Sequence, residues 1–272
     1  MEMTMSKLLR TGIVALVATT SSVVLSLGIA QAKDVVITTD KGWPPATFLN
    51  EQEKLEGYLY EIEVAAAKQA GWNAKFEYPS FEAVIPGLLS GKYDLGGNVD
   101  VNEERLKTLD IVSVLSIGYT LITRTDDGVT IADDMNDLCG RHLGIVASQV
   151  TLPAIEEQSK KCEAAGKEPV TVSTFPDTAS SQLAVLSKRV DATTITTSQS
   201  GWFVKNAPKW RVTGPIFGRT TAGIAVKKGN PLGQEMADAI NALIADGTYG
   251  SILSKWEATS AGIEKSEVVK GQ

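Results

Sequence analysis

An arginine beside a glycine-containing stretch is the residue of this sequence best suited to bind a small molecule. Residues 93–95 are expected to end a buried strand, and Gly96 and Gly97, which lack a Cβ, let a ligand approach the backbone. Asn102 then begins a helix as its N-cap, so Arg105 falls in the first turn. There its guanidinium could hold a carboxylate through two hydrogen bonds. The alternative is a solvated arginine on an amphipathic helix.

The residues that usually act as nucleophiles or metal ligands are few. The two cysteines, Cys139 and Cys162, are expected to form a disulfide, because exported proteins most simply pair two cysteines. Such a bridge would close a loop of about 23 residues and stabilise the fold by roughly 3 kcal/mol. The alternatives are two free buried thiols or, with less support, a metal site. His142 is the only histidine, and no ligand-spaced cluster surrounds it.

Length and composition indicate an ordinary globular protein. The chain has 272 residues, of which 43% are hydrophobic and 21% charged, enough for two modest domains. Its formal net charge is −6 and no basic run occurs, which argues against a nucleic-acid partner.

The N-terminus has the pattern of a secretory signal peptide, which we expect to span residues 1–32. Lys7 and Arg10 precede a mostly apolar stretch that contains no acidic residue. Ala30-Gln31-Ala32 is an A-x-A cleavage site, so the mature chain should begin at Lys33. The alternative is a retained membrane anchor. We expect a soluble mature protein exported to the periplasm, because no later stretch is long and apolar enough to span a bilayer.

Strand-like and helix-like segments alternate along the mature chain, which predicts parallel β-sheet with flanking helices. The first set of elements is 35–39, 60–70, 75–78, 81–89 and 93–95, and after an extended run at 117–124 the second set is 142–147, 151–165, 170–175, 180–186 and 190–194. A strand at 222–227 and helices at 231–245 and 251–256 follow. Residues 88–95 also align with 185–192, which favours two halves of similar architecture.

Several short motifs, in this order and spacing, resemble the polar amino-acid class of periplasmic solute-binding proteins that feed ABC importers. They are Pro44-Pro45, Gly57-Tyr58, residues 85–88 and 90–94, Glu104-Arg105, residues 245–249 and Lys255-Trp256. The similarity covers nearly all of residues 33–257. It implies the type II periplasmic binding fold, with two α/β lobes joined by crossing strands near 117–120 and 219–223. Lobe 1 would comprise 33–119 and 221–272, and lobe 2 would comprise 120–220. The ligand would lie between them.

The resemblance also implies the ligand contacts. Trp43 and Phe81 match the aromatic positions that enclose the ligand side chain, and Arg105 matches the carboxylate-binding arginine. The remaining positions expected to contact ligand are Asp40, Asn98, Asp100, Ser148, Gln149 and Thr196.

Four positions depart from the family pattern. Asp100 lies where a Ser or Thr hydroxyl usually assists the carboxylate, so it either accepts from a ligand amine or pairs with Arg105. Thr196 replaces an Asp that usually holds the α-ammonium, and Leu59 replaces another Asp. A helix expected to start at Ser148-Gln149 replaces the usual Gly-Thr, although its N–H groups could still bind an anion. We expect Asp40 and Asp100 to hold a cationic group instead.

The expected function is capture of an amino acid or amino-acid-like molecule for an ABC membrane permease, by a monomer without cofactor or metal. The alternative is an exported enzyme on the same fold, of the cyclic-acid dehydratase type, with Asp100 as its acid or base. A third possibility is a sensor that presents its closed form to a membrane receptor. The ligand itself stays open between amino acids, opines and other amine-bearing acids.

Overall fold

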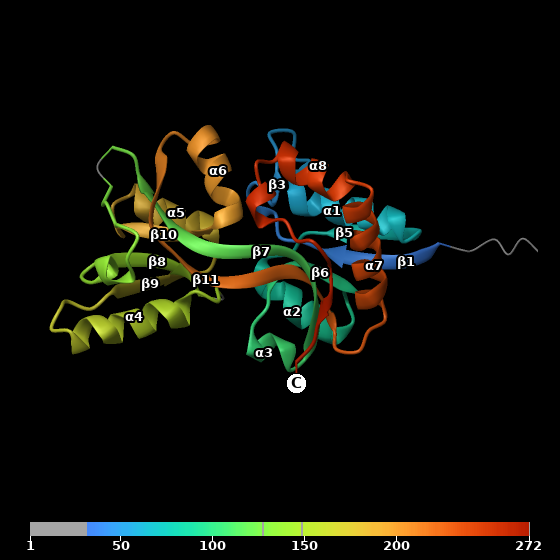
Figure 1. The fold of residues 1–272 in the computed structure, drawn as a ribbon, viewed down its shortest axis with the longest axis horizontal. Coiled ribbons are helices and arrows are strands. Elements are labelled where there is room, and N and C mark those ends of the chain that lie inside the picture. Colours follow the sequence, from blue (N-terminus) through green and yellow to red (C-terminus); the bar gives the residue numbers. More distant parts are fainter. Residues whose placement is uncertain (1–31, 127, 148, 272) are drawn as a thin grey trace, which may run out of the picture. The chain divides into compact units, whose positions relative to one another are not determined.

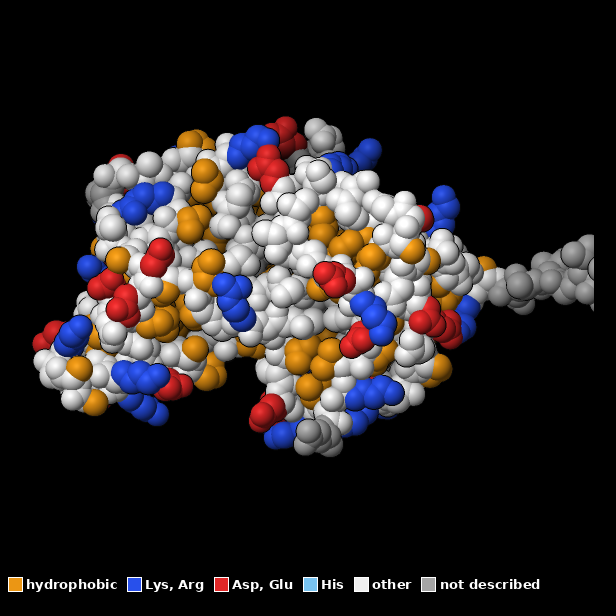
Figure 2. Space-filling model, viewed as in Figure 1, with side chains coloured by type: hydrophobic (Ala, Val, Ile, Leu, Met, Phe, Trp, Pro, Cys, Tyr) orange, Lys and Arg blue, Asp and Glu red, His pale blue; other side chains and the backbone are white. Residues whose placement is uncertain are grey.

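The computed structural model describes residues 32–126, 128–147 and 149–271. Residues 1–31 of the expected signal peptide and Ser148 therefore lie outside the described residues. No helix in the described ranges has the length and apolar character to cross a membrane. On the face drawn in Figure 2, acidic and basic side chains are interspersed over the whole surface.

One end of the main sheet is built from the first part of the chain. Strand β1 (Lys33–Thr38) pairs in parallel with β5 (Trp72–Glu77) and with β6 (Leu95–Asp100). Helices α1 (Tyr58–Gln69) and α2 (Phe81–Ser90) connect these strands, as the alternating pattern predicts. A parallel pair needs such a crossover, so the carboxyl ends of all three strands meet at one edge.

The other end of the sheet repeats this arrangement with the middle of the chain. Strand β8 (His142–Val146) pairs in parallel with β9 (Thr171–Phe175) and β10 (Ala192–Thr196). The helices that accompany them are α4 (Leu152–Ala164), α5 (Thr178–Leu186) and α6 (Thr197–Asn206).

Two long antiparallel strands join the two ends. Strands β7 (Leu109–Arg124) and β11 (Trp210–Lys227) pair along most of their length and run side by side through the middle of the molecule (Figure 1). The sequence pattern predicts only residues 117–124 of β7 and residues 222–227 of β11 as extended. The rest of β7 is buried almost without interruption and so lacks the alternation that marks a half-exposed strand. The strand order β5-β1-β6-β11-β7-β10-β8-β9 is continuous, and the division into two lobes remains a prediction.

The smaller elements complete this frame. A three-stranded sheet joins β2 (Gly42–Trp43), β3 (Thr47–Leu49) and β4 (Leu55–Glu56), and α3 (Glu103–Leu106) follows β6. The C-terminal part supplies α7 (Leu232–Ala245), α8 (Thr248–Lys255), the short 3₁₀ helix η2 (Thr259–Ala261) and β12 (Val268–Val269). Helix α7 packs on α1, and β12 pairs with β7, so this part returns to the first end of the sheet.

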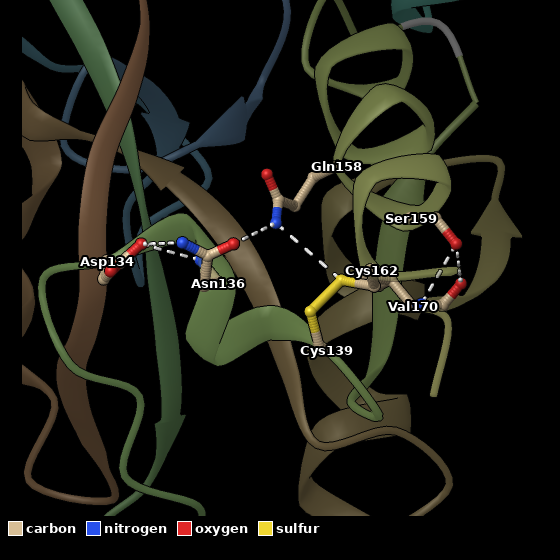
Figure 3. Close-up of a disulfide and its surroundings, with 7 residues drawn as sticks. All are labelled: Asp134, Asn136, Cys139, Gln158, Ser159, Cys162 and Val170. Carbon is tan, nitrogen blue, oxygen red and sulfur yellow. Dashed lines mark hydrogen bonds between the residues drawn. A yellow bond between two sulfur atoms is a disulfide. The ribbon is translucent and has the colours of Figure 1, made fainter. Parts of the chain in front are cut away.

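The predicted disulfide between Cys139 and Cys162 is confirmed (Figure 3). It connects the residue after the 3₁₀ helix η1 (Met135–Leu138) to the last turn of α4. Gln158, one turn earlier in α4, donates to Asn136 of η1 across 3.4 Å. The bridge therefore fastens a loop to a helix within the middle part of the chain.

The prediction that Gly96 and Gly97 form a ligand loop is wrong. Both glycines lie inside strand β6, where they are buried. A Cβ on Gly97 would lie 1.9 Å from Oε1 of Glu63 on helix α1. The glycine thus makes room for a neighbouring side chain and not for a ligand.

Glu63 is a fully buried carboxyl group. Its exposed fraction is 0%, and neither carboxyl oxygen has a hydrogen-bond partner among the described residues. Desolvation by burial raises the pKa of Glu63 well above the usual range. The folded protein consequently holds this proton to a higher pH than the unfolded chain does.

Glu63→Gln should remove a pH dependence of stability. The unfolded glutamate has a pKa near 4.5. As pH rises from there towards the higher folded pKa, the wild-type free energy of unfolding should fall by up to ~1.4 kcal/mol per pH unit. Urea unfolding between pH 5 and pH 8 measures this slope. The exposed Glu264→Gln serves as the control and should behave as wild type. Parallel profiles for wild type and Glu63→Gln would contradict the assignment.

Candidate functional site

A cavity of about 400 Å³ lies where the parallel strands of both ends of the sheet finish. Residues that follow β1, β5 and β9 closely line it, together with the last residues of β8 and β10. In parallel sheets, ligands generally bind at this edge. Eight of the nine predicted contact residues line the cavity: Asp40, Trp43, Phe81, Asn98, Asp100, Arg105, Gln149 and Thr196. The ninth, Ser148, lies outside the described residues.

Arg105 is held over an aromatic ring at one wall of the cavity. The side chain of Asn102 accepts a hydrogen bond from the Arg105 backbone N–H at 2.8 Å, which confirms the predicted N-cap. Nη1 of Arg105 donates to the backbone carbonyl of Asp100, also at 2.8 Å. The guanidinium carbon is 5.6 Å from the centre of the Phe81 ring. These contacts orient a planar cation beside the cavity.

Asp100 carries the most enclosed carboxylate of the cavity. Burial raises its pKa, and this effect is opposed by a hydrogen bond from the Tyr119 hydroxyl and by the charge of Arg105. Tyr119 itself is buried, and burial together with Asp100 raises its pKa well above the usual range. Tyr119 also lines the cavity, but the sequence analysis missed it because it lies in the middle of a buried strand.

Besides Asp100 and the exposed Glu82, two carboxylates line the cavity, one from each end of the sheet. Asp40 follows β1 and accepts from the Gly42 N–H at 3.0 Å. Burial is the main cause of its raised pKa, and the charge of Asp177 adds to the shift. Asp177 follows β9 and caps helix α5 by accepting from the Ser180 N–H at 2.7 Å. The sequence analysis also missed Asp177, although its place after a predicted parallel strand was a usable signal.

The side chains from the middle of the chain are tied into hydrogen-bond networks. Gln149 accepts from the Thr194 hydroxyl at 2.6 Å, and its Nε2 is buried without a partner in the described part of the chain. The helix expected at 151–165 is confirmed as α4, which begins at Leu152 after Thr151, so Gln149 lies before the helix and not in its first turn. Pro153 near its first position favours that start. Leu59 is buried in the core, away from the cavity lining.

A second hollow adjoins the cavity. It measures about 470 Å³, lies between α3 and the start of α4, and shares Gln149 with the first. Figure 2 shows an indentation of the surface between the parts that carry α4 and α3. The cavity is therefore bordered by a second hollow on the side of α3 and the start of α4.

The cavity is suited to holding a small molecule by charge and by aromatic contact. It combines carboxylates, one guanidinium and the rings of Trp43, Tyr78 and Phe81. Its volume is in the range of ligand pockets, which is about 300–1,000 Å³.

Comparisons with known proteins agree with this arrangement. The family described as bacterial extracellular solute-binding proteins, family 3, matches residues 35–259. The arginine-binding protein ArgT of Corynebacterium glutamicum is 26% identical over 218 residues, which are 79% of this chain and 71% of that protein. The L-cystine-binding protein TcyJ of Escherichia coli K12 is 27% identical over 219 residues, 79% of each chain.

Solved structures give the same result for the fold. An ancestral arginine-binding protein bound to arginine matches with a TM-score of 0.70 and 28% identity, over 82% of this chain and 97% of that one. The ancestral amino acid-binding protein AncCDT-1, a precursor of cyclohexadienyl dehydratase, has a TM-score of 0.71 at 23% identity, over 82% of this chain and 95% of that one, and shows a shared fold. The predicted two-part α/β architecture and the predicted resemblance are thereby confirmed, and the chain belongs to family 3 of the bacterial extracellular solute-binding proteins.

Proposed function

We propose that the cavity captures a small amino-acid-like molecule that carries a carboxylate and a cationic group. The observation that carries this proposal is the charge pattern of the cavity lining, in which Arg105 lies by Asp100, and Asp40 lies near enough to Asp177 for their charges to interact. A zwitterionic or dipolar guest satisfies both charges at once. Isolated charges in a partly dry cavity are costly unless each finds an opposite partner.

The aromatic residues complete the recognition. Trp43, Tyr78 and Phe81 line the same cavity and can enclose the carbon chain between the charged ends. Arg105, already braced by Asp100 and Phe81, presents donors to the ligand carboxylate. Asp40 and Asp177 accept from the distal cation. The arginine-binding relatives support this ligand class, since their names describe a guest with those two ends.

The transport role follows from family membership. We infer that the mature chain begins at Lys33, acts in the periplasm as a monomer, and delivers its ligand to the membrane permease of an ABC importer. Residues 33–119 with 221–272, and residues 120–220, form two lobes that close on the ligand about β7 and β11. The register of this pairing shifts between Thr213 and Phe217 and again between Phe217 and Thr220, and such irregular pairing supports a hinge there.

The enzyme alternative depends on Asp100. A buried carboxyl group with a raised pKa, hydrogen-bonded to Tyr119, has the properties of a general acid. The fold shared with a dehydratase precursor also permits it. Incubation of the protein with candidate cyclic acids, followed by mass spectrometry, separates the two functions. A binding protein returns each compound chemically unchanged, and turnover would contradict the transport role.

Arg105→Gln should weaken binding of L-arginine about 10- to 100-fold, because a charge-assisted hydrogen bond to the carboxylate contributes roughly 1.5–3 kcal/mol. Isothermal titration calorimetry on protein refolded from denaturant, which removes any co-purified ligand, measures the dissociation constant. The control is Arg219→Gln, an exposed position outside the cavity lining. Equal affinities for wild type and Arg105→Gln would contradict the assigned carboxylate contact.

Asp40→Asn should abolish the discrimination between L-arginine and L-citrulline, which have the same shape but differ in the charge of the distal group. The wild type should prefer arginine, because Asp40 and Asp177 face that end with negative charge. The expected change in the affinity ratio is about tenfold or more. The matched control is Asp34→Asn, at an exposed position in β1, the strand that precedes Asp40. An unchanged ratio would place the cation elsewhere.

A further inference from the structure

A chain of buried hydrogen bonds connects helix α6 to two separate segments of the first end of the sheet. The Tyr58 hydroxyl on α1 lies 2.8 Å from the Ser198 hydroxyl, which lies 2.9 Å from the hydroxyl of Thr196. Thr196 in turn bonds Oε1 of Gln199 at 3.0 Å, and Nε2 of Gln199 donates to the backbone carbonyl of Pro44 at 2.7 Å. Each of these four side chains is at most 4% exposed.

The direction of every bond in this chain is determined by two backbone groups. The Pro44 carbonyl can only accept and the Thr196 N–H can only donate, at 2.9 Å, so the Gln199 amide has one possible orientation. Thr196 must therefore donate its hydroxyl proton to Gln199, Ser198 must donate to Thr196, and Tyr58 must donate to Ser198. Every hydroxyl proton in the chain is used.

This order has a consequence for the cavity. Thr196 lines the cavity, but its hydroxyl proton is already donated to Gln199. Its neighbours Ser198 and Gln199 do not line the cavity at all. The network thus joins one residue of the cavity wall, Thr196, to side chains that contact the first end of the sheet.

Other contacts of α6 join the same two parts. The rings of Trp202 on α6 and Phe48 on β3 have centroids 6.4 Å apart. Lys205 forms an ion pair with Glu257, although both side chains are largely exposed and such pairs contribute little. The buried hydrogen bonds are therefore the specific part of this contact.

We propose that Tyr58, Ser198, Thr196 and Gln199 form an interlobe latch, a set of positioning residues that holds the cavity closed with or without ligand. The Tyr58–Ser198 and Gln199–Pro44 bonds are its two bridges, and the bonds among Thr196, Ser198 and Gln199 connect them. The latch rests on the lobe closure of the proposed function. It raises ligand affinity by increasing the fraction of molecules already in the binding-competent form, and Tyr58, Ser198 and Gln199 do not line the cavity.

Each bridge can be removed separately by a nearly isosteric change. Tyr58→Phe deletes the hydroxyl that reaches Ser198. Gln199→Glu, measured at a pH at which its carboxyl group is ionised, keeps an acceptor for Thr196 but presents an oxygen, and no donor, to the Pro44 carbonyl. The matched controls are Tyr249→Phe, whose buried hydroxyl donates to Val114 within the first part at 2.7 Å, and Ser200→Ala, whose hydroxyl bonds only Thr197 in its own helix at 2.7 Å.

The test measures shape and binding together. Without ligand, the Tyr58→Phe/Gln199→Glu double variant should have a larger radius of gyration by small-angle X-ray scattering than wild type and both controls. Each single variant should bind L-arginine and L-citrulline more weakly by the same factor, about 3- to 10-fold, the range for one buried hydrogen bond. A factor that differs between the two ligands would indicate direct ligand contact and overturn the latch.

The two proposals fail in different ways. If the wild type binds neither L-arginine nor L-citrulline, the proposed ligand class is wrong, and the ligand-free scattering comparison still decides the latch. If the double variant has the wild-type radius of gyration, the latch is wrong whatever the ligand. Circular dichroism of each variant establishes that it is folded, and each single variant provides the same comparison where the double variant does not fold.

Discussion

The antiparallel pairing of β7 with β11 is the constraint on which the rest of the structure depends. These two strands are the only part of the described main sheet that contacts both parallel sets of strands. Because they run through its centre, the carboxyl ends of β1, β5 and β6 point towards those of β8, β9 and β10. The cavity exists because the carboxyl ends of two sets of parallel strands face each other.

This arrangement explains why the cavity residues come from so many places in the sequence. Each parallel strand delivers the residues that follow it, so Asp40, Phe81 and Asp177 meet although long helices separate them in the chain. The side chains of Asp40 and Asp100 are partly buried at this end of the strands. Burial accordingly dominates the pKa shifts of Asp40 and Asp100.

The sequence alone predicts those features that depend on local patterns. Residues of helices α1 and α2, the N-cap at Asn102 and the disulfide follow from periodicity, capping preference and cysteine count. It does not predict that Gly97 accommodates Glu63, or that Tyr119 reaches Asp100, because both contacts join elements distant in the chain. The first half of β7 is missed because a strand buried on both faces has no alternation to detect.

The chain order of the two parts has a consequence for how the protein is made. All strands and helices from β8 to α6 are contiguous in sequence, so this part can assemble as soon as it has been synthesised. The first part cannot, since α1 must wait for α7 and β6 must wait for the C-terminal half of β11. Its apolar surfaces stay uncovered until the last fifty or so residues emerge, as expected for N-terminal and C-terminal segments that share one core. An exported chain that stays unfolded until late is also one that a secretion channel can still thread.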